Sequence, residues 1–546
     1  MSAYNMNNYE SVRREFSWTR PANYNFVRDV FDHWAQQTPD KPALLWVDDN
    51  GNELTRSFAD IAADSRKLCN LLERHDIQRG ETVFVMLGRK PEWWITFTAC
   101  LRMGAVFSPG TTQLSAKDIA YRINAAQVTC FITDMENAAK LEQIIGQCPT
   151  LKSRIVLGGE RDGWIPYQHA MADAGTEYES PVTAINDDAM CYFTSGTTGH
   201  PKMCIHSHGY PMGHISTGKY WLDLQPDDLH WNISDTGWAK AAWSSYFGPW
   251  LAGVTIFIHH TAGFNARRTL ELLQQYPVTT MCGAPTIYRM LVLEDLKQYH
   301  FKSLRHCVGA GEPLNPEVID IWRDATGLTI RDGYGQTETG ILCASFPPIE
   351  PRLGSMGKPA PGIDLQIIDD HGNILPPDTE GDIAVRVVPE RPLGLFKEYR
   401  NNPEKTAAVF VGEWYITGDR ARKDKDGYFW FISRADDVIL SAGYRIGPFE
   451  VESALIEHPA VAESAVVSSP DETRGEVVKA FVVLAPGFVP GDELKKELQE
   501  HVKSITAPYK YPRKLEFIDA LPKTVSGKIR RIELREREWS GKKSAG

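Results

Sequence analysis

Short apolar runs alternate with amphipathic stretches along most of this chain, and this rhythm limits what the chain can fold into. Residues 82–87 and 126–133 have the continuous apolar character of buried strands, whereas residues 58–72 and 92–103 carry apolar side chains at helical spacing. Parallel strands need a long crossover connection, which is usually a helix, so alternating strands and helices favour parallel pairing. The sequence therefore predicts an α/β fold with largely parallel sheets.

The character of the sequence changes near residue 434. Turn-rich strands at 414–432 end there, and a compact unit with two helices and two strands follows at 448–502. A chain of 546 residues is also too long for a single hydrophobic core. We therefore predict a large N-terminal domain of stacked sheets with helices over residues 1–433, and a small α+β C-terminal domain over residues 434–546.

The charge of the chain argues against nucleic acid as a partner. The formal net charge is −11, and a general nucleic-acid binder needs concentrated Lys and Arg for its phosphate contacts. Residues 495–546 differ from the rest, because they hold fourteen Lys and Arg against seven Asp and Glu. This stretch is either a solvated basic helix or a patch for a phosphate-rich ligand.

Cysteine usage and hydropathy bear on the compartment. The nine cysteines form no CxxC pair, which is typical of a reduced protein rather than of a disulfide framework or a zinc site. The first sixteen residues lack the apolar segment of a secretory signal. The longest uncharged run, 241–266, is interrupted by Pro249 and two histidines, so it reads as a buried helix and a core strand. We therefore predict a cytoplasmic protein without a transmembrane segment.

The most informative segment is rich in glycine and hydroxyl side chains and follows an apolar strand at 189–193. Its two glycines allow a tight turn that presents N–H groups to phosphate oxygens, and its final lysine adds a point charge. The spacing is not that of the Walker motif. An ordinary Ser/Thr/Gly hairpin is the alternative, but so many phosphate donors beside a strand end favour a nucleotide-phosphate loop. Its residues are Thr194, Ser195, Gly196, Thr197, Thr198, Gly199, His200, Pro201 and Lys202.

A second segment, from Asp332 to Gly340, carries side chains that suit a nucleotide and its metal. Tyr334 offers a flat face, Gln336 an amide and Glu338 a carboxylate for a hard cation. Mg²⁺ bound to a nucleotide takes one or two carboxylates together with phosphate oxygens. Glu338 is therefore the candidate metal ligand.

Two single residues complete the set. Asp419 ends the strand at 414–419, where a carboxylate can bind both hydroxyls of a ribose or can be a plain turn residue. Lys528 precedes a helix-like stretch that starts at Ile529, so its charge opposes the helix dipole. A mild local conflict of this kind is where a functional residue can sit, and the alternative is an exposed lysine in a basic tail.

Together these segments resemble one known family closely: the adenylate-forming superfamily of acyl-CoA synthetases, firefly luciferases and peptide-synthetase adenylation domains. Within it, the chain looks most like the medium-chain acyl-CoA synthetases. The resemblance runs from about Phe26 to Trp539, and its further motifs lie at 234–238, 283–291, 441–448 and 506–514. Ordered motifs at the family's spacing make coincidence a poor explanation.

The resemblance implies a role in ATP binding for each segment. Residues 194–202 become the loop around the ATP phosphates, and Glu338 binds Mg²⁺. Thr337 lies near the substrate carboxylate, Arg445 contacts phosphate in the first half-reaction, and Lys528 meets the acid carboxylate and the α-phosphate; with Glu338 these are the implied catalytic residues. The positions implied for adenine, ribose and the α-phosphate are Gly311, Glu312, Pro313, Asp332, Gly333, Tyr334, Gly335, Gln336, Thr337, Asp419 and Arg434.

The resemblance also implies a mobile C-terminal domain, with Asp436 at the hinge. Attack on the α-phosphate needs its charge neutralised, whereas thiolysis needs the same space cleared for a thiol, so a rotating domain serves both steps. The substrate's own carboxylate attacks ATP, so no protein nucleophile is needed, and His206 and His208 are expected to be structural. The positions that match CoA contacts are Gln113, Ala442, Gly443, Tyr444, Arg474, Ser504 and Arg513.

The acid pocket is implied by the same resemblance at Trp238, Gly309, Ala310, Thr337 and Gly340. A tryptophan there can wall a short or medium pocket, although it can also belong to the core. Residues 239–242 and 308–311 depart from the animal mitochondrial enzymes. These departures leave the preferred chain length and branching open.

We therefore predict an ATP-dependent acid–CoA ligase. A carboxylic acid, medium-chain fatty by resemblance, and ATP give acyl-AMP and diphosphate, and acyl-AMP and CoA then give acyl-CoA and AMP. The rivals are a short-chain, branched-chain or aryl-CoA ligase, an adenylating enzyme that loads a carrier protein, and a non-catalytic sensor. Lys528 argues against a sensor, and Arg474 with the basic tail favours CoA, because its 3′-phosphate suits arginine. A monomer and a homodimer both remain open.

Overall fold

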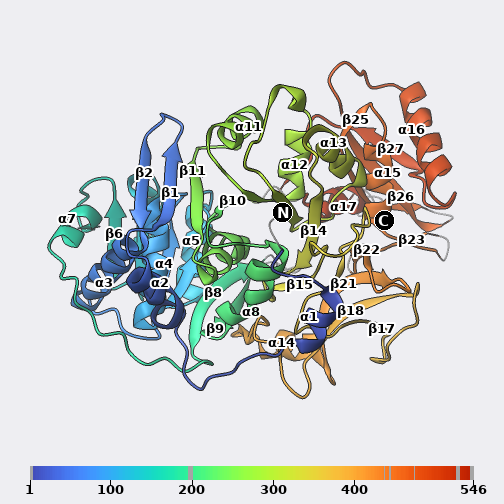
Figure 1. Cartoon of the computed structure of the whole chain (residues 1–546). Coiled ribbons are helices and arrows are strands. Elements are labelled where there is room, and N and C mark those ends of the chain that lie inside the picture. The colour runs from blue at the N-terminus through green and yellow to red at the C-terminus, as the bar shows by residue number, and fades with distance from the viewer. Residues whose placement is uncertain are drawn as a thin grey trace.

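The computed structural model describes residues 4–194, 201–435, 437–441, 444–471, 474–523 and 529–540, without the side chain of Arg445. Within these ranges the chain forms four sheets. In Figure 1 the N-terminal half (blue to green) builds the left and centre of the molecule, and the C-terminal sheet (red) lies at the upper right.

The first large sheet has eight strands in the order β19-β9-β8-β4-β3-β5-β6-β7. Its central pairs are parallel, and β9 returns antiparallel beside β8. All five residues of β3 are buried, as expected for a strand covered on both faces. The strands are β3 (Thr82–Met86), β4 (Val106–Pro109), β5 (Val128–Asp134), β6 (Ser153–Leu157), β7 (Ile165–Pro166), β8 (Asp188–Thr194), β9 (Lys202–Ser207) and β19 (Glu398–Arg400).

The second large sheet has nine strands in the order β16-β15-β14-β13-β12-β10-β11-β1-β2. The pairs from β14 through to β1 are parallel, and antiparallel strands close both edges. The strands are β1 (Pro42–Asp48), β2 (Glu53–Ser57), β10 (Leu229–Ile233), β11 (Thr255–His260), β12 (Thr280–Gly283), β13 (His306–Ala310), β14 (Ile330–Gly335), β15 (Ile341–Ala344) and β16 (Lys358–Pro359).

Helices cover these two sheets, and local sequence signals start them. Ser57 and Asp60 form a capping box at the start of α3, and Ser115 with Asp118 forms another at α5. The helices that precede residue 434 are α1 (Tyr9–Glu15), α2 (Asp32–Gln37), α3 (Phe58–Arg74), α4 (Pro91–Met103), α5 (Ala116–Ala125), α6 (Met135–Glu142), α7 (Tyr167–Ala172), α8 (Tyr210–Gly213), α9 (Ala239–Ala242), α10 (Gly248–Leu251), α11 (Ala266–Gln275), α12 (Pro285–Leu291), α13 (Pro316–Thr326) and α14 (Pro403–Val409), with π-helical turns at Val27–Phe31, Ser216–Trp221 and Trp243–Phe247.

The core between the two sheets is aromatic. The Phe97 ring stacks on Phe107 and on Tyr246, with centroid distances of 4.0 and 4.1 Å. Beside this stack, Arg102 is 1% exposed and forms two hydrogen bonds of 2.7 Å with the Asp32 carboxylate. A cation buried this deeply needs a charged partner, so the pair ties α4 to α2.

The third sheet is antiparallel and consists of β17 (Leu365–Ile368), β18 (Glu380–Arg386), β20 (Phe410–Val411), β21 (Trp414–Lys423) and β22 (Phe429–Arg434). The prediction of largely parallel sheets is wrong for this part of the chain. The physical reason is local, because short turns such as the one at Gly427 connect these strands, and such turns suffice for antiparallel but not for parallel neighbours.

The C-terminal sheet contains β23 (Ile439–Ser441), β24 (Tyr444–Ile446), β25 (Val461–Asp471), β26 (Gly475–Leu484) and β27 (Lys514–Phe517). Its helices are α15 (Pro448–Ile456), α16 (Asp492–Ile505) and α17 (Arg531–Ser540). A separate apolar cluster, which includes Val451, Val466 and Leu498, packs between this sheet and α15 and α16.

The α/β class and the elements named from the sequence are confirmed. The predicted helices at 58–72 and 92–103 are α3 and α4, and the predicted strands at 82–87 and 126–133 are β3 and β5, each shifted by at most two residues. All nine cysteines are described, and each is buried and unpaired. No helix of the described residues is long and apolar enough to cross a bilayer.

Candidate active site

Side chains at the end of β14 bind the carboxylate of Asp419, which lies within β21. Asp419 is 7% exposed, and its Oδ2 accepts hydrogen bonds from the Tyr334 hydroxyl and from Gln336 Nε2, both at 2.6 Å. Gln336 also donates to the carbonyl of Thr417 at 2.9 Å. Asp419 lies opposite Arg434 in the antiparallel β21–β22 pair. The predicted Asp332–Gly340 segment and the predicted ribose residue Asp419 therefore meet in space.

A second cluster surrounds Glu338, in the loop between β14 and β15. The Tyr399 hydroxyl donates to Glu338 Oε1 at 2.7 Å. The ammonium group of Lys202 lies 4.5 Å from the centre of the Tyr399 ring, at a distance suited to a cation–π contact. Burial lowers the pKa of Lys202, and the Glu338 carboxylate opposes that shift. A cation and a carboxylate thus lie close to one aromatic ring.

The predicted phosphate loop joins two antiparallel strands. Thr194 at the end of β8 pairs with Lys202 at the start of β9. Ser195, Gly196, Thr197, Thr198, Gly199 and His200 lie outside the described residues. Pro201 is partly buried, and its carbonyl accepts a hydrogen bond from the Tyr121 hydroxyl at 3.0 Å.

The predicted adenine segment, Gly311 to Pro313, follows β13. Gly311 has a φ of 109°, a left-handed conformation that favours glycine. The Glu312 carboxylate accepts hydrogen bonds from Arg289 at 2.7 Å and from the Thr286 hydroxyl at 3.1 Å. Glu312 is therefore fixed by α12, which indicates that this residue holds the shape of the segment.

Asp332 lies on β14, next to β13, in a fully buried position. Burial raises the pKa of Asp332 to about 8, although the N–H of Gly333 donates to its Oδ1 at 2.8 Å and Lys240 lies near enough to favour the charged form. A buried carboxyl that is protonated near neutral pH can donate as well as accept a hydrogen bond.

Two of the predicted acid-pocket residues, Gly309 and Ala310, lie at the end of β13. Gly309 and Ala310 pair with Asp332 and Gly333 across β13 and β14. The Lys240 ammonium donates to the Ala310 carbonyl at 2.9 Å, which places the segment after Trp238 against the same strand end. The Nε1 of Trp238 is buried and has no partner among the described residues.

Two large aromatic rings pack against β14, the strand beside β13. A Cβ on Gly333 would lie 2.5 Å from the Trp221 ring, and one on Gly335 would lie 3.0 Å from the Trp243 ring. Larger residues at 333 and 335 would therefore collide with these rings. Sequence reasoning missed Trp221 and Trp243, because about a hundred residues separate each of them from the part of β14 that it contacts.

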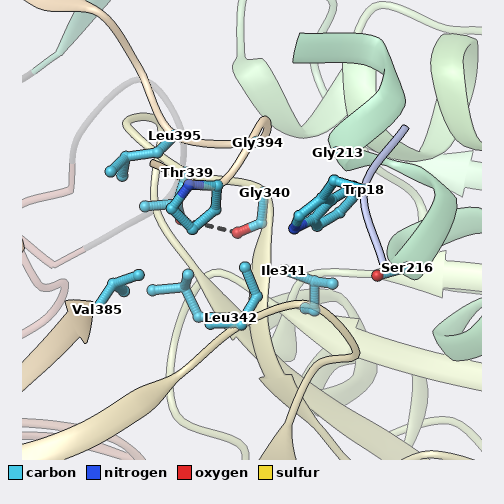
Figure 2. Close-up of a pocket in the computed structure, with 12 residues that line it drawn as sticks. Trp18, Gly213, Ser216, Thr339, Gly340, Ile341, Leu342, Val385, Gly394 and Leu395 are labelled. Atoms are coloured by element: carbon cyan, nitrogen blue, oxygen red, sulfur yellow. Dashed lines mark hydrogen bonds between the residues drawn. The ribbon is translucent and has the colours of Figure 1, made fainter. Parts of the chain in front are cut away.

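Figure 2 shows a small cavity beside the loop between β14 and β15. Thr339, Gly340, Trp18 and Leu395 are among the residues that line it. Its volume is about 10 Å³, which suits about one water molecule. The Trp18 indole is fixed by a 3.0 Å hydrogen bond to the Gly362 carbonyl. On this side of Gly340 there is therefore no room for an acyl chain.

The predicted CoA residues lie on two parts of the molecule. Gln113 is exposed in the turn after β4, close to the 234–238 segment, because a Cβ on Gly237 would lie 2.2 Å from the Thr111 nitrogen. In the C-terminal unit, the exposed Tyr444 stacks on Tyr509 at 4.3 Å. The other described CoA candidates, also exposed, are Arg474, Ser504 and Arg513.

Besides the phosphate loop, four predicted positions lie outside the described residues: Asp436, Ala442, Gly443 and Lys528. Of Arg445 the structure describes the backbone, within β24. The described neighbours of Asp436 are held, because Arg535 donates to Asp437 Oδ1 at 3.3 Å.

Comparison with known families assigns nearly the whole chain. The AMP-binding enzyme model matches residues 31–399, and the AMP-binding enzyme C-terminal domain model matches residues 450–528. The chain belongs to the AMP-binding enzymes. The predicted family is thereby confirmed, and its two models fall on the large sheets and on the C-terminal sheet.

Similar curated AMP-binding enzymes include two human proteins. The chain is 52% identical to the mitochondrial acyl-coenzyme A synthetase ACSM3 of Homo sapiens, over 98% of this chain and 93% of that protein. It is 52% identical to the mitochondrial acyl-coenzyme A synthetase ACSM4 of Homo sapiens, over 96% of this chain and 92% of that protein.

Two solved structures have a fold similar to that of this chain. The anthranilate CoA ligase AuaEII, in complex with anthranoyl-AMP, has a TM-score of 0.88 and 31% identity over 95% of this chain and 98% of that one. The acyl-CoA synthetase of Brucella canis has a TM-score of 0.76 and 34% identity over 98% of this chain and 99% of that one.

These relatives confirm one prediction and correct another. The prediction of an ATP-dependent acid–CoA ligase, which acts through an acyl-adenylate, is confirmed by the family and by the acyl-CoA synthetase relatives. The prediction of a cytoplasmic location is contradicted, because the ACSM3 and ACSM4 relatives are mitochondrial proteins. The reduced state of the cysteines, on which that prediction rested, does not distinguish one reducing compartment from another.

Sequence reasoning also missed residues that hold the loop from 336 to 340. Tyr399 binds Glu338, and the Tyr210 hydroxyl approaches the Thr339 carbonyl at 3.4 Å. His206 was expected to be structural, but no partner was predicted for it. Its Nε2 lies 2.8 Å from the Thr337 carbonyl oxygen. One signal was available, because His206 follows Lys202 by four residues in a strand, which places both on one face.

Proposed function

We propose that this AMP-binding enzyme, an ATP-dependent acid–CoA ligase, prefers medium-chain fatty acids. The acid and ATP give acyl-AMP and diphosphate, and CoA then displaces AMP to give acyl-CoA. The observation that carries the proposed site is the convergence on Asp419 of Tyr334 and Gln336, from a segment more than eighty residues away.

Each described side chain has a role in this proposal. Asp419 and Arg434 bind the ribose, and Tyr334 with Gln336 borders the adenine. Lys202 contacts the phosphates, since its ammonium lies beside the Glu338 cluster. The remaining residues assigned to ATP by resemblance, which are those of the 194–202 loop, the 311–313 segment and Asp332, Gly333, Gly335 and Thr337, belong to the same proposal.

The metal assignment rests on Glu338. No group of three or more His, Cys, Asp or Glu that could hold a metal occurs among the described residues. A single carboxylate nevertheless fits Mg²⁺ that arrives with ATP, because such a metal takes most of its ligands from phosphate and water. When bound, Mg²⁺ supplies positive charge to the phosphate groups, and Tyr399 orients the carboxylate that would hold it.

The division of labour between two domains is also a proposal. We place the boundary at 433/434, because β22 ends at Arg434 and the next strand, β23, belongs to another sheet. Asp436 is the proposed hinge, and Lys528 and Arg445 act in the adenylation orientation. For thiolysis, the exposed Tyr444, Arg474, Ser504 and Arg513, with Ala442, Gly443 and Gln113, receive CoA.

The proposed acid class rests on the ACSM relatives, and the residues assigned to its pocket belong to the same proposal. Trp238, Gly309, Ala310 and Gly340 border the proposed acyl site with Thr337, and the ACSM relatives support a fatty acid. An aryl or short branched acid is the second candidate. It is favoured by the Trp221 and Trp243 rings behind β14 and by the likeness to an anthranilate CoA ligase.

The test is an AMP-release assay with straight acids of two to twelve carbons, branched acids and aromatic acids, each with and without CoA. A maximum at medium chain length is expected. A maximum with benzoate-type or short branched acids would replace the proposed acid class without affecting the ligase assignment.

The role of Lys528 is tested by Lys528→Ala. We expect this change to abolish acid-dependent exchange of diphosphate into ATP, because the α-phosphate loses its neutralising charge. Thiolysis of supplied acyl-adenylate should remain. Equal loss of both half-reactions would contradict the assigned role.

A further inference from the structure

His206 is a buried histidine that the assigned chemistry does not use. It is 0% exposed and lies near the end of β9, four residues after Lys202. Its Nε2 is 2.8 Å from the Thr337 carbonyl oxygen. A carbonyl can only accept, so Nε2 carries the proton and donates. The imidazole is therefore a fixed hydrogen-bond donor to the backbone of the loop that carries Glu338.

The loop is held at two further carbonyls. The N–H of Phe396 donates to the Glu338 carbonyl at 2.7 Å, and the Tyr210 hydroxyl lies 3.4 Å from the Thr339 carbonyl. The Tyr210 ring packs on His206 with a centroid distance of 3.8 Å. Three successive carbonyls, from Thr337 to Thr339, are thus bound by groups from outside the loop.

The environment keeps His206 in its neutral form. Its Nδ1 is buried and has no partner among the described residues, so a second proton would place an uncompensated charge in the core. Burial lowers the pKa of His206 to about 3. The donor therefore stays on Nε2 throughout the pH range in which the enzyme can be assayed.

From this geometry we infer that His206 is a positioning residue for adenylation. Its Nε2–H holds the Thr337 carbonyl and thereby fixes the direction in which the Thr337 hydroxyl and the Glu338 carboxylate point. Because Lys202 comes from the same face of β9, one strand sets the spacing between the phosphate lysine and the candidate metal carboxylate. This inference rests on the proposed roles of Thr337, Glu338 and Lys202.

The test compares His206→Gln with His206→Asn. A glutamine amide nitrogen can reach the place of Nε2, whereas an asparagine amide nitrogen reaches only the place of Nδ1. We expect His206→Gln to keep diphosphate exchange within about fivefold of wild type. His206→Asn should lower kcat by about 10- to 100-fold, as misplaced catalytic groups do, with the KM for ATP changed by less than about threefold.

His208→Gln and His208→Asn are the matched controls. His208 is two residues further along and equally buried, but neither ring nitrogen has a hydrogen-bond partner among the described residues. We expect both His208 variants to have similar kcat values. Equal kcat for the two His206 variants, or the same contrast at His208, would overturn the inference. Wild-type protein without exchange for any acid would instead overturn the proposed function on which the inference rests.

Discussion

At the scale of single residues, the site is organised by two carboxylates that accept hydrogen bonds from neighbouring side chains. Oδ2 of Asp419 accepts from Tyr334 and Gln336, and Oε1 of Glu338 accepts from Tyr399. Hydrogen bonds to a charged acceptor are short and strong, so these partners hold each carboxylate in one orientation. The binding groups are therefore ordered before a nucleotide arrives.

Asp419→Asn tests the ribose assignment. The amide keeps the shape of the carboxylate but loses its charge and one acceptor site. Its hydrogen bonds with Tyr334, Gln336 and the ribose hydroxyls should therefore be weaker. We expect the KM for ATP in diphosphate exchange to rise by about tenfold, because a hydrogen bond to a charged group contributes about 1.5–3 kcal/mol. A raised KM for the acid with an unchanged KM for ATP would contradict the assignment.

Tyr399→Phe tests the orientation of Glu338. The substitution removes the hydroxyl that donates to Oε1 but keeps the ring beside Lys202. We expect a higher Mg²⁺ concentration at half-maximal exchange and a rate lower by about fivefold to tenfold. Glu338→Gln is the reference, and it should lose far more activity. A Phe variant with an unchanged Mg²⁺ profile would remove Tyr399 from the site.

At the scale of elements, buried charge fixes how helices meet. Arg102 on α4 donates to Asp32 on α2 through two 2.7 Å hydrogen bonds and to the Ser65 hydroxyl on α3 at 3.0 Å. The helices α2, α3 and α4 are thus joined at one guanidinium group. Arginine suits this place because its planar fork binds a carboxylate through two nitrogens.

Arg102→Met tests this contact. The methionine fills similar space but leaves the buried Asp32 carboxylate with only the longer ion pair to Arg66, at 3.6 Å. We therefore expect a loss of stability of up to about 3–5 kcal/mol. Urea denaturation, followed by tryptophan fluorescence, measures it. The double change Asp32→Leu with Arg102→Met should recover most of the loss. A double variant as unstable as Arg102→Met would show that packing, and not the poorly paired carboxylate, is responsible.

At the scale of the whole molecule, the contact between the C-terminal unit and the large sheets is polar in part. Asn315, just before α13, donates to the Ser453 hydroxyl on α15 at 3.2 Å. Glu317 on α13 and Glu457 at the end of α15 lie near each other, and burial together with Glu457 raises the pKa of Glu317. Weak hydrogen bonds and like charges are compatible with the proposed rotation of the C-terminal domain.

Asp436→Pro tests the proposed rotation. Proline fixes φ, so the chain between Ala435 and Asp437 could no longer change direction freely. We expect diphosphate exchange to persist while release of acyl-CoA falls by more than about tenfold, measured with the same acid. Asp436→Ala is the control and should keep both activities. Normal overall turnover in the proline variant would show that the domains do not rotate at this residue.

Much of the local structure and the identity of the chemistry follow from the sequence. Capping residues such as Ser57 and Ser115 and the runs at 82–87 and 126–133 act through neighbouring residues, so their elements can be predicted within two residues. The antiparallel third sheet was missed, because parallel pairing was predicted from alternating strands and helices, whereas short turns connect the strands of this sheet.

The sequence by itself determined the family and the two-step ligase chemistry, because motif chemistry is written in residue types at fixed local spacing. Tertiary structure alone decided which side chains meet. Asp419 accepts hydrogen bonds from Tyr334 and Gln336, and Glu338 accepts one from Tyr399. The Thr337 carbonyl accepts one from His206, and in each case more than sixty residues separate the partners. Such partners are set by strand register and sheet order, and no local pattern encodes them.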